Sequence, residues 1–290
     1  MRSIPGRIAL AAVAVVVLAS AWIAWRVRTA IRAPSPVLSL DVNRERDVRL
    51  LPGTPLVFTV SLSGAPRGPV TRVGAEDRPW QSGLRLELAG SGEPLPWKPL
   101  PLSSPISIRF ARDARGHPTV EQDAGEEALL DADHVHTIDL AVGPEETARV
   151  AAGRYTIVAR LGSSLWPPWR WRPRVVSNPV VVTIRRAAGA TVPAAELESR
   201  RLAELADYYL RAKRYEDARK TALRMLKADP WSVDGYTVLG DALGGLNRNA
   251  DALEAYEYAL LVMPSPGPEA EPPSYLIERL GQARARAGKR

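Results

Sequence analysis

The chain has 290 residues, enough for about two domains, and 46% hydrophobic with 24% charged residues is an ordinary globular composition. It contains no cysteine, which excludes disulfides, thiolate metal sites and a thiol nucleophile. The net charge of +7 divides into +5 for residues 1–33, +2 for residues 34–190 and 0 for residues 191–290. Because the excess sits at the N-terminus, we expect no nucleic-acid partner.

An apolar run extends from Ile8 to Trp25, with only Ser20 polar, and arginines stand on both sides of it. Eighteen helical residues span about 27 Å, just enough to cross the hydrocarbon core. Residues 1–33 are therefore predicted to form a single transmembrane helix that anchors the chain, with a cleaved signal peptide as the alternative. This predicts a single-pass membrane protein whose bulk is periplasmic or otherwise extracytoplasmic.

Residues 34–186 contain seven short segments in which apolar and polar residues alternate with period two. Such alternation is typical of antiparallel strands with one buried face, and connectors rich in Pro and Gly separate the segments. Seven strands in this length predict a β-sandwich. The acidic stretch 121–133 is predicted to be a solvated loop. The expected strands span 38–42, 56–62, 84–88, 106–110, 136–142, 154–161 and 180–185.

The penultimate predicted strand opens with Gly153-Arg154-Tyr155. This Gly-x-Tyr sequence resembles the tyrosine corner of immunoglobulin-like domains. The chain lacks the Cys pair and the intervening Trp of antibody-type domains, so the resemblance is to the broad fold. It implies an all-β immunoglobulin-like sandwich over residues 34–186 and no particular function.

After a linker at residues 187–192, the periodicity becomes helical. Aligning the chain on Pro230 and Pro264 superimposes small residues at two further positions. These pairs are Ala206 with Gly240 and Ala218 with Ala252. Small residues allow two antiparallel helices to approach closely, and each Pro ends the second helix of a pair.

This spacing resembles that of the tetratricopeptide repeat family, most clearly in the second copy, with Leu239-Gly240 and the series Ala252, Tyr256, Ala259, Pro264. The resemblance covers about residues 197–264. It implies all-α helical hairpins over residues 193–290, with two repeats and a capping helix at 275–287. Two repeats are fewer than the three usually needed for independent stability, so the helices are expected to pack on the sandwich, another copy or a partner.

Members of this family usually bind peptides or partner proteins in a groove lined by the first helix of each repeat. The resemblance assigns this protein-binding groove to five residues, and its two aspartates would favour a basic peptide. The alternative is that they are solvated residues on helix faces. The five residues are Ala203, Asp207, Leu210, Thr237 and Asp241.

A Trp- and Arg-rich segment lies between the last two predicted strands. Trp and Arg are enriched at binding hot spots, so this loop is a candidate surface for recognition of carbohydrate or lipid. The alternative is that its Trp rings cover the edge of the sandwich. The residues concerned are Trp166, Trp169, Arg170, Trp171, Arg172 and Arg174.

His134 and His136 could place two imidazoles on one strand face, which makes them a weak candidate for a metal site. Asp131, Asp133 and Asp139 have the wrong parity to join them, and the face continues into apolar residues. We therefore expect no metal and no cofactor. No nucleophile elbow or phosphate-binding glycine loop is present in the sequence.

Together these features predict a multidomain α and β chain: a transmembrane helix, an immunoglobulin-like sandwich and tetratricopeptide hairpins. The expected function is that of a non-enzymatic, membrane-anchored scaffold or adaptor that binds protein partners in the cell envelope, with a homo-oligomer as one arrangement. The alternative is a sandwich that binds envelope carbohydrate or lipid through the Trp/Arg loop.

Overall fold

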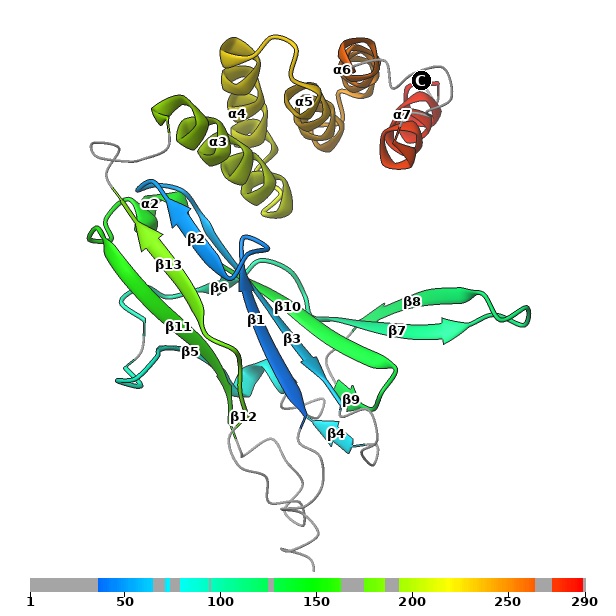
Figure 1. Ribbon diagram of the computed structural model, residues 1–290. Coiled ribbons are helices and arrows are strands. Elements are labelled where there is room, and N and C mark those ends of the chain that lie inside the picture. Colours follow the sequence, from blue (N-terminus) through cyan, green and yellow to red (C-terminus); the bar gives the residue numbers. More distant parts are fainter. Residues whose placement is uncertain are drawn as a thin grey trace, which may run out of the picture.

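The computed structural model describes residues 36–64, 71–73, 79–93, 95–124, 128–162, 175–185, 193–263 and 273–288. A β-rich N-terminal region is followed by a helical C-terminal region (Figure 1). The strands are β1 (Val37–Val42), β2 (Asp47–Leu50), β3 (Leu56–Ser63), β4 (Thr71–Val73), β5 (Leu84–Leu88), β6 (Leu100–Pro101), β7 (Ile106–Arg112), β8 (Pro118–Ala124), β9 (Ala128–Leu130), β10 (His134–Val142), β11 (Gly153–Leu161), β12 (Val175–Val176) and β13 (Val180–Ile184). Two short helical turns, η1 (Trp80–Gly83) and α2 (Pro144–Thr147), lie among them.

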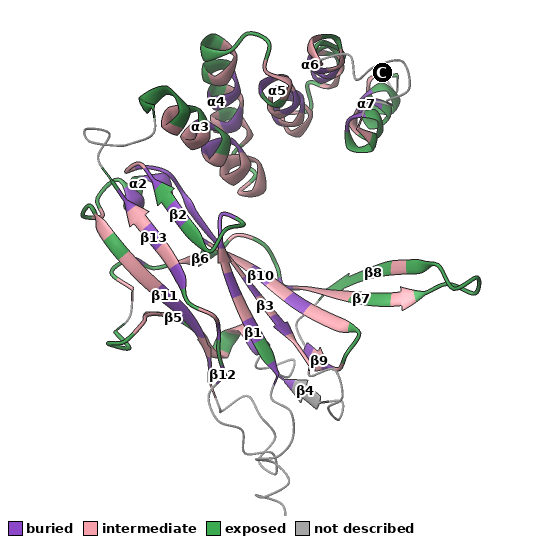
Figure 2. Ribbon diagram, viewed as in Figure 1, coloured by how far each residue is buried: buried purple, intermediate pink, exposed green. Residues whose placement is uncertain are grey.

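The strands form two main sheets that enclose one core. The first has the order β1-β3-β10-β7-β8, with β6 also paired to β10, and the second has the order β12-β11-β13-β2, with β5 also paired to β11. One buried cluster includes Phe58 and Ile138 from the first sheet and Ile157 and Val182 from the second. The buried residues are therefore concentrated where the sheets face each other (Figure 2).

All seven predicted strands are present, as β1, β3, β5, β7, β10, β11 and β13. Period-two alternation identified most of them because they bury one face: in β13, for example, Val180, Val182 and Ile184 are buried and the residues between them are not. In β7 the alternation is present although no residue is buried. The hydroxyl of Tyr155 donates to the carbonyl oxygen of Ala151 at 2.8 Å, four residues upstream. This bond anchors the start of β11 to the preceding loop.

The predicted solvated loop at 121–133 is wrong for most of its described residues. Residues 118–124 form β8, which pairs along its whole length with β7, and residues 128–130 form β9, which pairs with β4. The β7–β8 hairpin extends beyond the rest of the first sheet (Figure 1), so Phe110 and Val120 remain exposed. Because both faces of β8 are exposed, its sequence has no pattern of burial to reveal it.

The helical region contains α3 (Ala194–Arg211), α4 (Tyr215–Ala228), α5 (Val233–Gly245), α6 (Asn249–Val262) and α7 (Ser274–Ala287). The second helices of the two hairpins, α4 and α6, have the same length and begin and end at equivalent positions of the repeat. The turns before them also match, because Lys213 and Asn247 both adopt positive φ angles, 57° and 60°. The repeat in the sequence is therefore also a repeat of helices and turns in the structure.

Small residues lie where the helices approach most closely. Ala206, Ala218 and Ala252 are fully or almost fully buried. A Cβ atom at Gly240 would lie 2.5 Å from the ring of Tyr256, so only glycine fits there. The predicted role of these residues is confirmed.

No helix in the described part of the chain is long and apolar enough to span a membrane. The longest described helix, α3, has 18 residues but carries charged side chains along its length, among them Glu198, Arg200 and Glu204. The predicted fold class is therefore corrected to a β-rich region followed by helices, without the transmembrane helix, and the predicted single-pass membrane localisation is withdrawn with it. Residues 1–33, on which that prediction was based, lie outside the described residues, as does the linker at 187–192.

Substituting Gly240 should destabilise the helical region because the new Cβ atom would displace the buried ring of Tyr256. We expect Gly240→Ala to lower the free energy of unfolding by about 1–3 kcal/mol. Gly244→Ala is the matched control: its Cβ atom would meet nothing within 4 Å, so the loss of backbone entropy in the unfolded chain should raise stability by about 0.5–1 kcal/mol. Urea denaturation of both variants tests this contrast, and equal effects would contradict the packing argument.

Candidate functional site

The five predicted groove residues do not share one open face. Ala203 and Asp207 of α3 face the turn between β1 and β2, where Asp207 forms an ion pair with Arg44 at 3.5 Å. Thr237 is buried, and its hydroxyl donates to the carbonyl oxygen of Val233. Leu210 is half-buried, whereas Asp241 lines a separate pocket at the other end of the helical array.

The turn between β1 and β2 is shaped to meet α3. Asn43 and Arg44 have φ angles of 48° and 66°, and the Asn43 side chain accepts a hydrogen bond from the amide of Val57 at 2.8 Å. Asparagine tolerates this left-handed conformation better than most residues. The turn therefore holds Arg44 and Glu45 at the surface that α3 covers.

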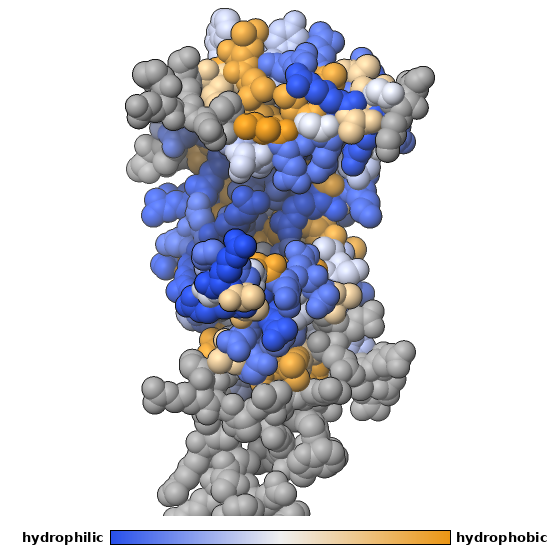
Figure 3. Space-filling model, turned by 90° about the vertical axis from the view of Figure 1, so that its right-hand side faces the viewer, coloured by the Kyte–Doolittle hydropathy of each residue, from blue (hydrophilic) through white to orange (hydrophobic). Residues whose placement is uncertain are grey.

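Charged contacts dominate the boundary between the β region and the helices. In the view of Figure 3, the surface where the two regions meet is mostly hydrophilic. Four ion pairs cross this boundary within the described residues, and they engage charged side chains of α3 and of the turn that follows it. The pairs are Arg44–Asp207, Glu45–Arg200, Asp139–Arg211 and Glu145–Arg214.

Glu204 lies in a cavity of about 150 Å³ at this boundary, beside Asp207 and Arg211 of α3 and Asn43 of the turn. Burial raises the pKa of the Glu204 carboxyl from its ordinary value of 4.5 to about 7, and repulsion from the Asp207 carboxylate contributes to this rise. Arg200 and Arg44 oppose this shift. The ionised carboxylate is thus less favourable in the folded protein than in the unfolded chain.

Glu204→Gln should therefore be more stable than the wild type at high pH. The raised pKa favours the protonated carboxyl in the folded state, so its contribution is complete below pH 4.5 and is lost as the pH rises through 7. We expect the variant to gain about 1 kcal/mol over the wild type at pH 8, after allowing for solvent screening, and nothing at pH 4.5. Denaturant unfolding at both pH values measures the difference. Glu254→Gln, on an exposed part of α6, should match the wild type at both.

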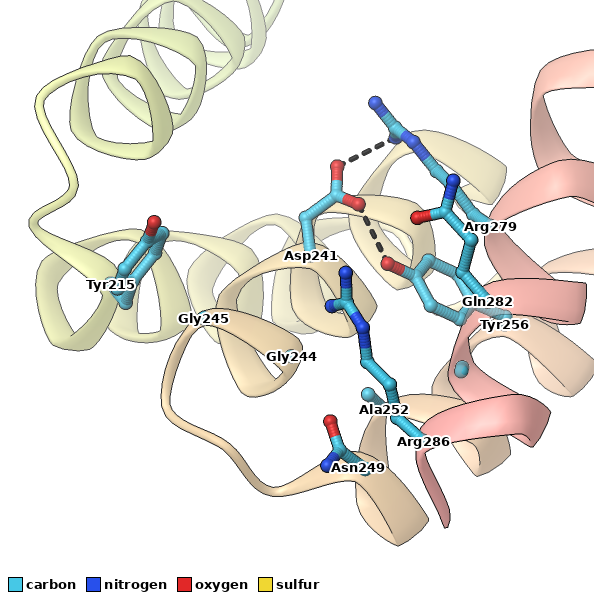
Figure 4. A pocket seen from close by; sticks show the side chains of 11 residues that line it. Tyr215, Asp241, Gly244, Gly245, Asn249, Ala252, Tyr256, Arg279, Gln282 and Arg286 are labelled. Atoms are coloured by element: carbon cyan, nitrogen blue, oxygen red, sulfur yellow. Dashed lines mark hydrogen bonds and ion pairs between the residues drawn. The ribbon is translucent and has the colours of Figure 1, made fainter. Parts of the chain in front are cut away.

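A second pocket, of about 250 Å³, opens between α5, α6 and α7 (Figure 4). The Asp241 carboxylate lies on one side, where it accepts a hydrogen bond from the Tyr256 hydroxyl at 2.7 Å and pairs with Arg279 at 2.6 Å. Burial raises the pKa of the Asp241 carboxyl, and the contacts with Tyr256 and Arg279 oppose that rise. Gln282 and Arg286 of α7 and Asn249 of α6 also line the pocket.

Gly244 leaves this pocket open. Glycine at Gly240 and Gly245 is required by packing, because a Cβ atom there would overlap the ring of Tyr256 or of Tyr215. Gly244 is different, since it lines the pocket and its Cβ atom would meet nothing within 4 Å. Leu210 occupies the equivalent position in the first repeat. The second repeat thus has open space where the first has a side chain.

The described polar contacts of His134 and His136 lie within the protein. The Nδ1 atom of His134 lies 2.8 Å from Asp131, and the Nε2 atom of His136 lies 2.9 Å from the carbonyl oxygen of Leu129. Asp131 reaches His134 because it lies in the turn before β10, where strand parity does not apply. No group of three metal-ligating side chains occurs among the residues that the structure describes.

His136 should make the protein less stable at mildly acidic pH. It is fully buried in the core, and burial lowers the pKa of its imidazole, so the unfolded chain takes up a proton below pH 6.5 more readily than the folded protein does. Between pH 7.5 and pH 5, we expect the wild type to lose more stability than His136→Leu. The measurement is thermal denaturation across this pH range. Both proteins carry Glu204→Gln, so that the opposing titration of Glu204 is absent. Identical pH dependence in the two proteins would contradict this assignment.

A cavity of about 600 Å³ lies along β5 and the segment that follows it. Trp97 lines it and packs edge-on against Tyr155, with ring centroids 5.3 Å apart, and the indole nitrogen of Trp97 has no hydrogen-bond partner in the described structure. Trp97 lies outside every alternating segment of the sequence, so no pattern in the sequence pointed to it. The predicted Trp/Arg surface, from Trp166 to Arg174, lies outside the described residues.

No family model matches this chain, and no curated protein matches it. Among solved structures, it is similar to the major pilin subunit of Bacillus cereus, with 11% sequence identity and a TM-score of 0.25. The match covers 52% of this chain and only 40% of the pilin chain. At this level of likeness, the function has to be argued from the chain's own residues.

Proposed function

We propose that this protein is a non-enzymatic scaffold that binds partner proteins through the pocket between α5, α6 and α7. The observation that carries the proposal is the open space in front of Gly244, at a position where packing does not require glycine. Glycine inside a helix costs about 1 kcal/mol relative to alanine. A ligand that enters the pocket supplies a reason for its presence.

The helical architecture supports the proposal. The equal lengths and equivalent bounds of α4 and α6, the matching turns before them and the small residues between helices fit the tetratricopeptide repeat resemblance. Likewise, two facing sheets and the Tyr155 hydrogen bond fit the immunoglobulin-like resemblance of the β region. Repeats of this kind commonly bind proteins in the groove along their first helices, and α3 here is covered by the β region. The pocket between α5 and α7 is the part of that groove that remains open.

Site-specific photocrosslinking in cells of the source organism tests the proposal. A photoreactive residue at Gln282, on the pocket, should capture a defined set of proteins that the same residue at Lys220, on exposed α4, does not. Gly244→Leu, which introduces the residue of the first repeat, should abolish this capture because its side chain fills the pocket.

The matched control is Gly281→Leu. Gly281 lies on an exposed part of α7, its Cβ atom would meet nothing within 4 Å, and it does not line the pocket. This variant should retain capture, and both leucine variants should keep a melting temperature no lower than that of the wild type. Capture that is equal at the two crosslinking positions, or that survives Gly244→Leu, would rule out the pocket as the binding site.

A further inference from the structure

The first sheet ends differently at its two edges. At one edge the protein itself closes β1, because the backbone N–H of Leu40 donates to the Asn178 side chain at 3.0 Å and that side chain donates back to the Leu40 carbonyl oxygen at 2.8 Å. At the other edge, β8 pairs with β7 and, within the described residues, with no other strand. Figure 1 shows this edge on the hairpin that reaches past the rest of the sheet. One edge is therefore capped, and the other is open to a further strand.

The open edge of β8 presents backbone donors and acceptors. The Phe110 amide of β7 donates to the carbonyl oxygen of Asp133 at 2.8 Å, and Asp133 directly precedes β10, the strand on the other side of β7. Phe110 lies opposite Val120, and opposite residues of an antiparallel pair either exchange both hydrogen bonds or exchange none. The N–H and C=O groups of Val120 therefore point to the open edge, and by the alternation along a strand so do those of Gln122.

The two faces of this hairpin differ in polarity. On one face, Phe110 and Val120 lie opposite each other, with exposed fractions of 52% and 65%. The other face carries Asp123 and an ion pair between Arg109 and Glu121 at 3.3 Å. A strand that adds to this edge extends the apolar stripe on one face. On the other face it must not bring a carboxylate against Glu121 or Asp123, since like charges directly opposite each other are destabilising.

A second copy of β8 is one such strand, and the charges select its register. When two copies pair antiparallel about a two-fold axis, three registers use the outward-facing backbone groups along most of the strand. A register centred on Glu121 places this carboxylate opposite its own copy. A register centred on Gln122 places Glu121 opposite Asp123 of the other copy. Both registers oppose like charges and are disfavoured.

The third register, centred on Val120, has no such conflict. It places Glu121 opposite Thr119 of the other copy, and Asp123 opposite His117. A hydroxyl and an imidazole can each donate a hydrogen bond to a carboxylate. Each acidic side chain of the edge thus meets a donor, and β8 is complementary to itself in this register.

We propose that β8 pairs with β8 of a second copy of this chain, with the two Val120 residues opposite each other on the two-fold axis. The Val120 residues exchange both backbone hydrogen bonds, and Gln122 donates to the carbonyl oxygen of Pro118 in the other copy. The return bond is absent because proline has no N–H. The apolar stripe of Phe110 and Val120 continues from one copy into the other. The same patch serves both copies, as a two-fold interface requires.

Oxidative crosslinking of single-cysteine variants of the full chain tests the register. The chain contains no cysteine, so each variant carries one thiol. The Cα atoms of the two Val120 residues lie about 5.5 Å apart in a hydrogen-bonded antiparallel pair, within the range of a disulfide. Val120→Cys should therefore form a covalent dimer under mild oxidation. Gln122→Cys, on the same face and edge, is the matched control and should not crosslink, because its two copies lie about 14 Å apart.

Sedimentation equilibrium of the cysteine-free chain tests whether this edge drives association. The wild type should reach twice the mass of one chain. Val120→Lys should stay at the mass of one chain, because two lysines would face each other across the axis. Val37→Lys makes the same change at another exposed valine, at the start of the capped strand β1, and should keep the dimer.

A wild-type chain that stays monomeric would overturn the proposal and leave the edge of β8 to a strand of another protein. Dimers that persist in Val120→Lys would overturn it as well, since association would then use another surface. Crosslinking of Gln122→Cys that is as fast as that of Val120→Cys would reject the register. Loss of the dimer in Val120→Lys alone, together with a crosslink confined to Val120→Cys, supports the proposal.

Discussion

Among the described residues, the joint between the β region and the helices is built on the carboxamide of Asn43. It accepts a hydrogen bond from the amide of Val57 at 2.8 Å and donates one to the carbonyl oxygen of Pro55 at 3.1 Å. These bonds hold the turn after β1 in a left-handed conformation, which directs Arg44 and Glu45 toward α3. Since α3 is the first helix of the array and each later helix packs on the one before, this turn also fixes where the rest of the helical region lies.

Because α3 docks on the β region, the two repeats have different roles. Asp207 and Asp241 occupy equivalent positions in the two repeats, and each pairs with an arginine from outside its own repeat. Arg44 comes from the β region, so the first repeat is used to join the two parts of the chain. Arg279 comes from α7, so the second repeat closes the end of the array and leaves a pocket beside the pair. The same residue in the same helical position thus stabilises an internal boundary in one repeat and the wall of a pocket in the other.

Much of the fold could be predicted from the sequence, because most of the predicted strands bury one face and because the helical repeat has a fixed period. β8 could not be predicted, since neither of its faces is buried. The ion pairs of the aspartates could not be predicted from the sequence either. Arg44 and Asp207 lie in different regions of the chain, and no local pattern connects them. Asp131 was excluded by strand parity, yet it binds His134, because parity holds only for residues inside the strand.

Packing explains two of three glycines in the second half of α5, but it does not explain the third. Gly240 and Gly245 allow the rings of Tyr256 and Tyr215 to lie against the helix, and both rings line the pocket. These two glycines therefore shape the pocket by admitting other side chains of the same protein. Gly244 admits none, although the first repeat shows that leucine is compatible with the same helical position. Glycine at this position makes the helix less stable than a residue with a side chain would. The open space in front of Gly244 lies beside Arg286, which has no ion pair among the described residues. This is the geometry of a site that receives a group from another molecule.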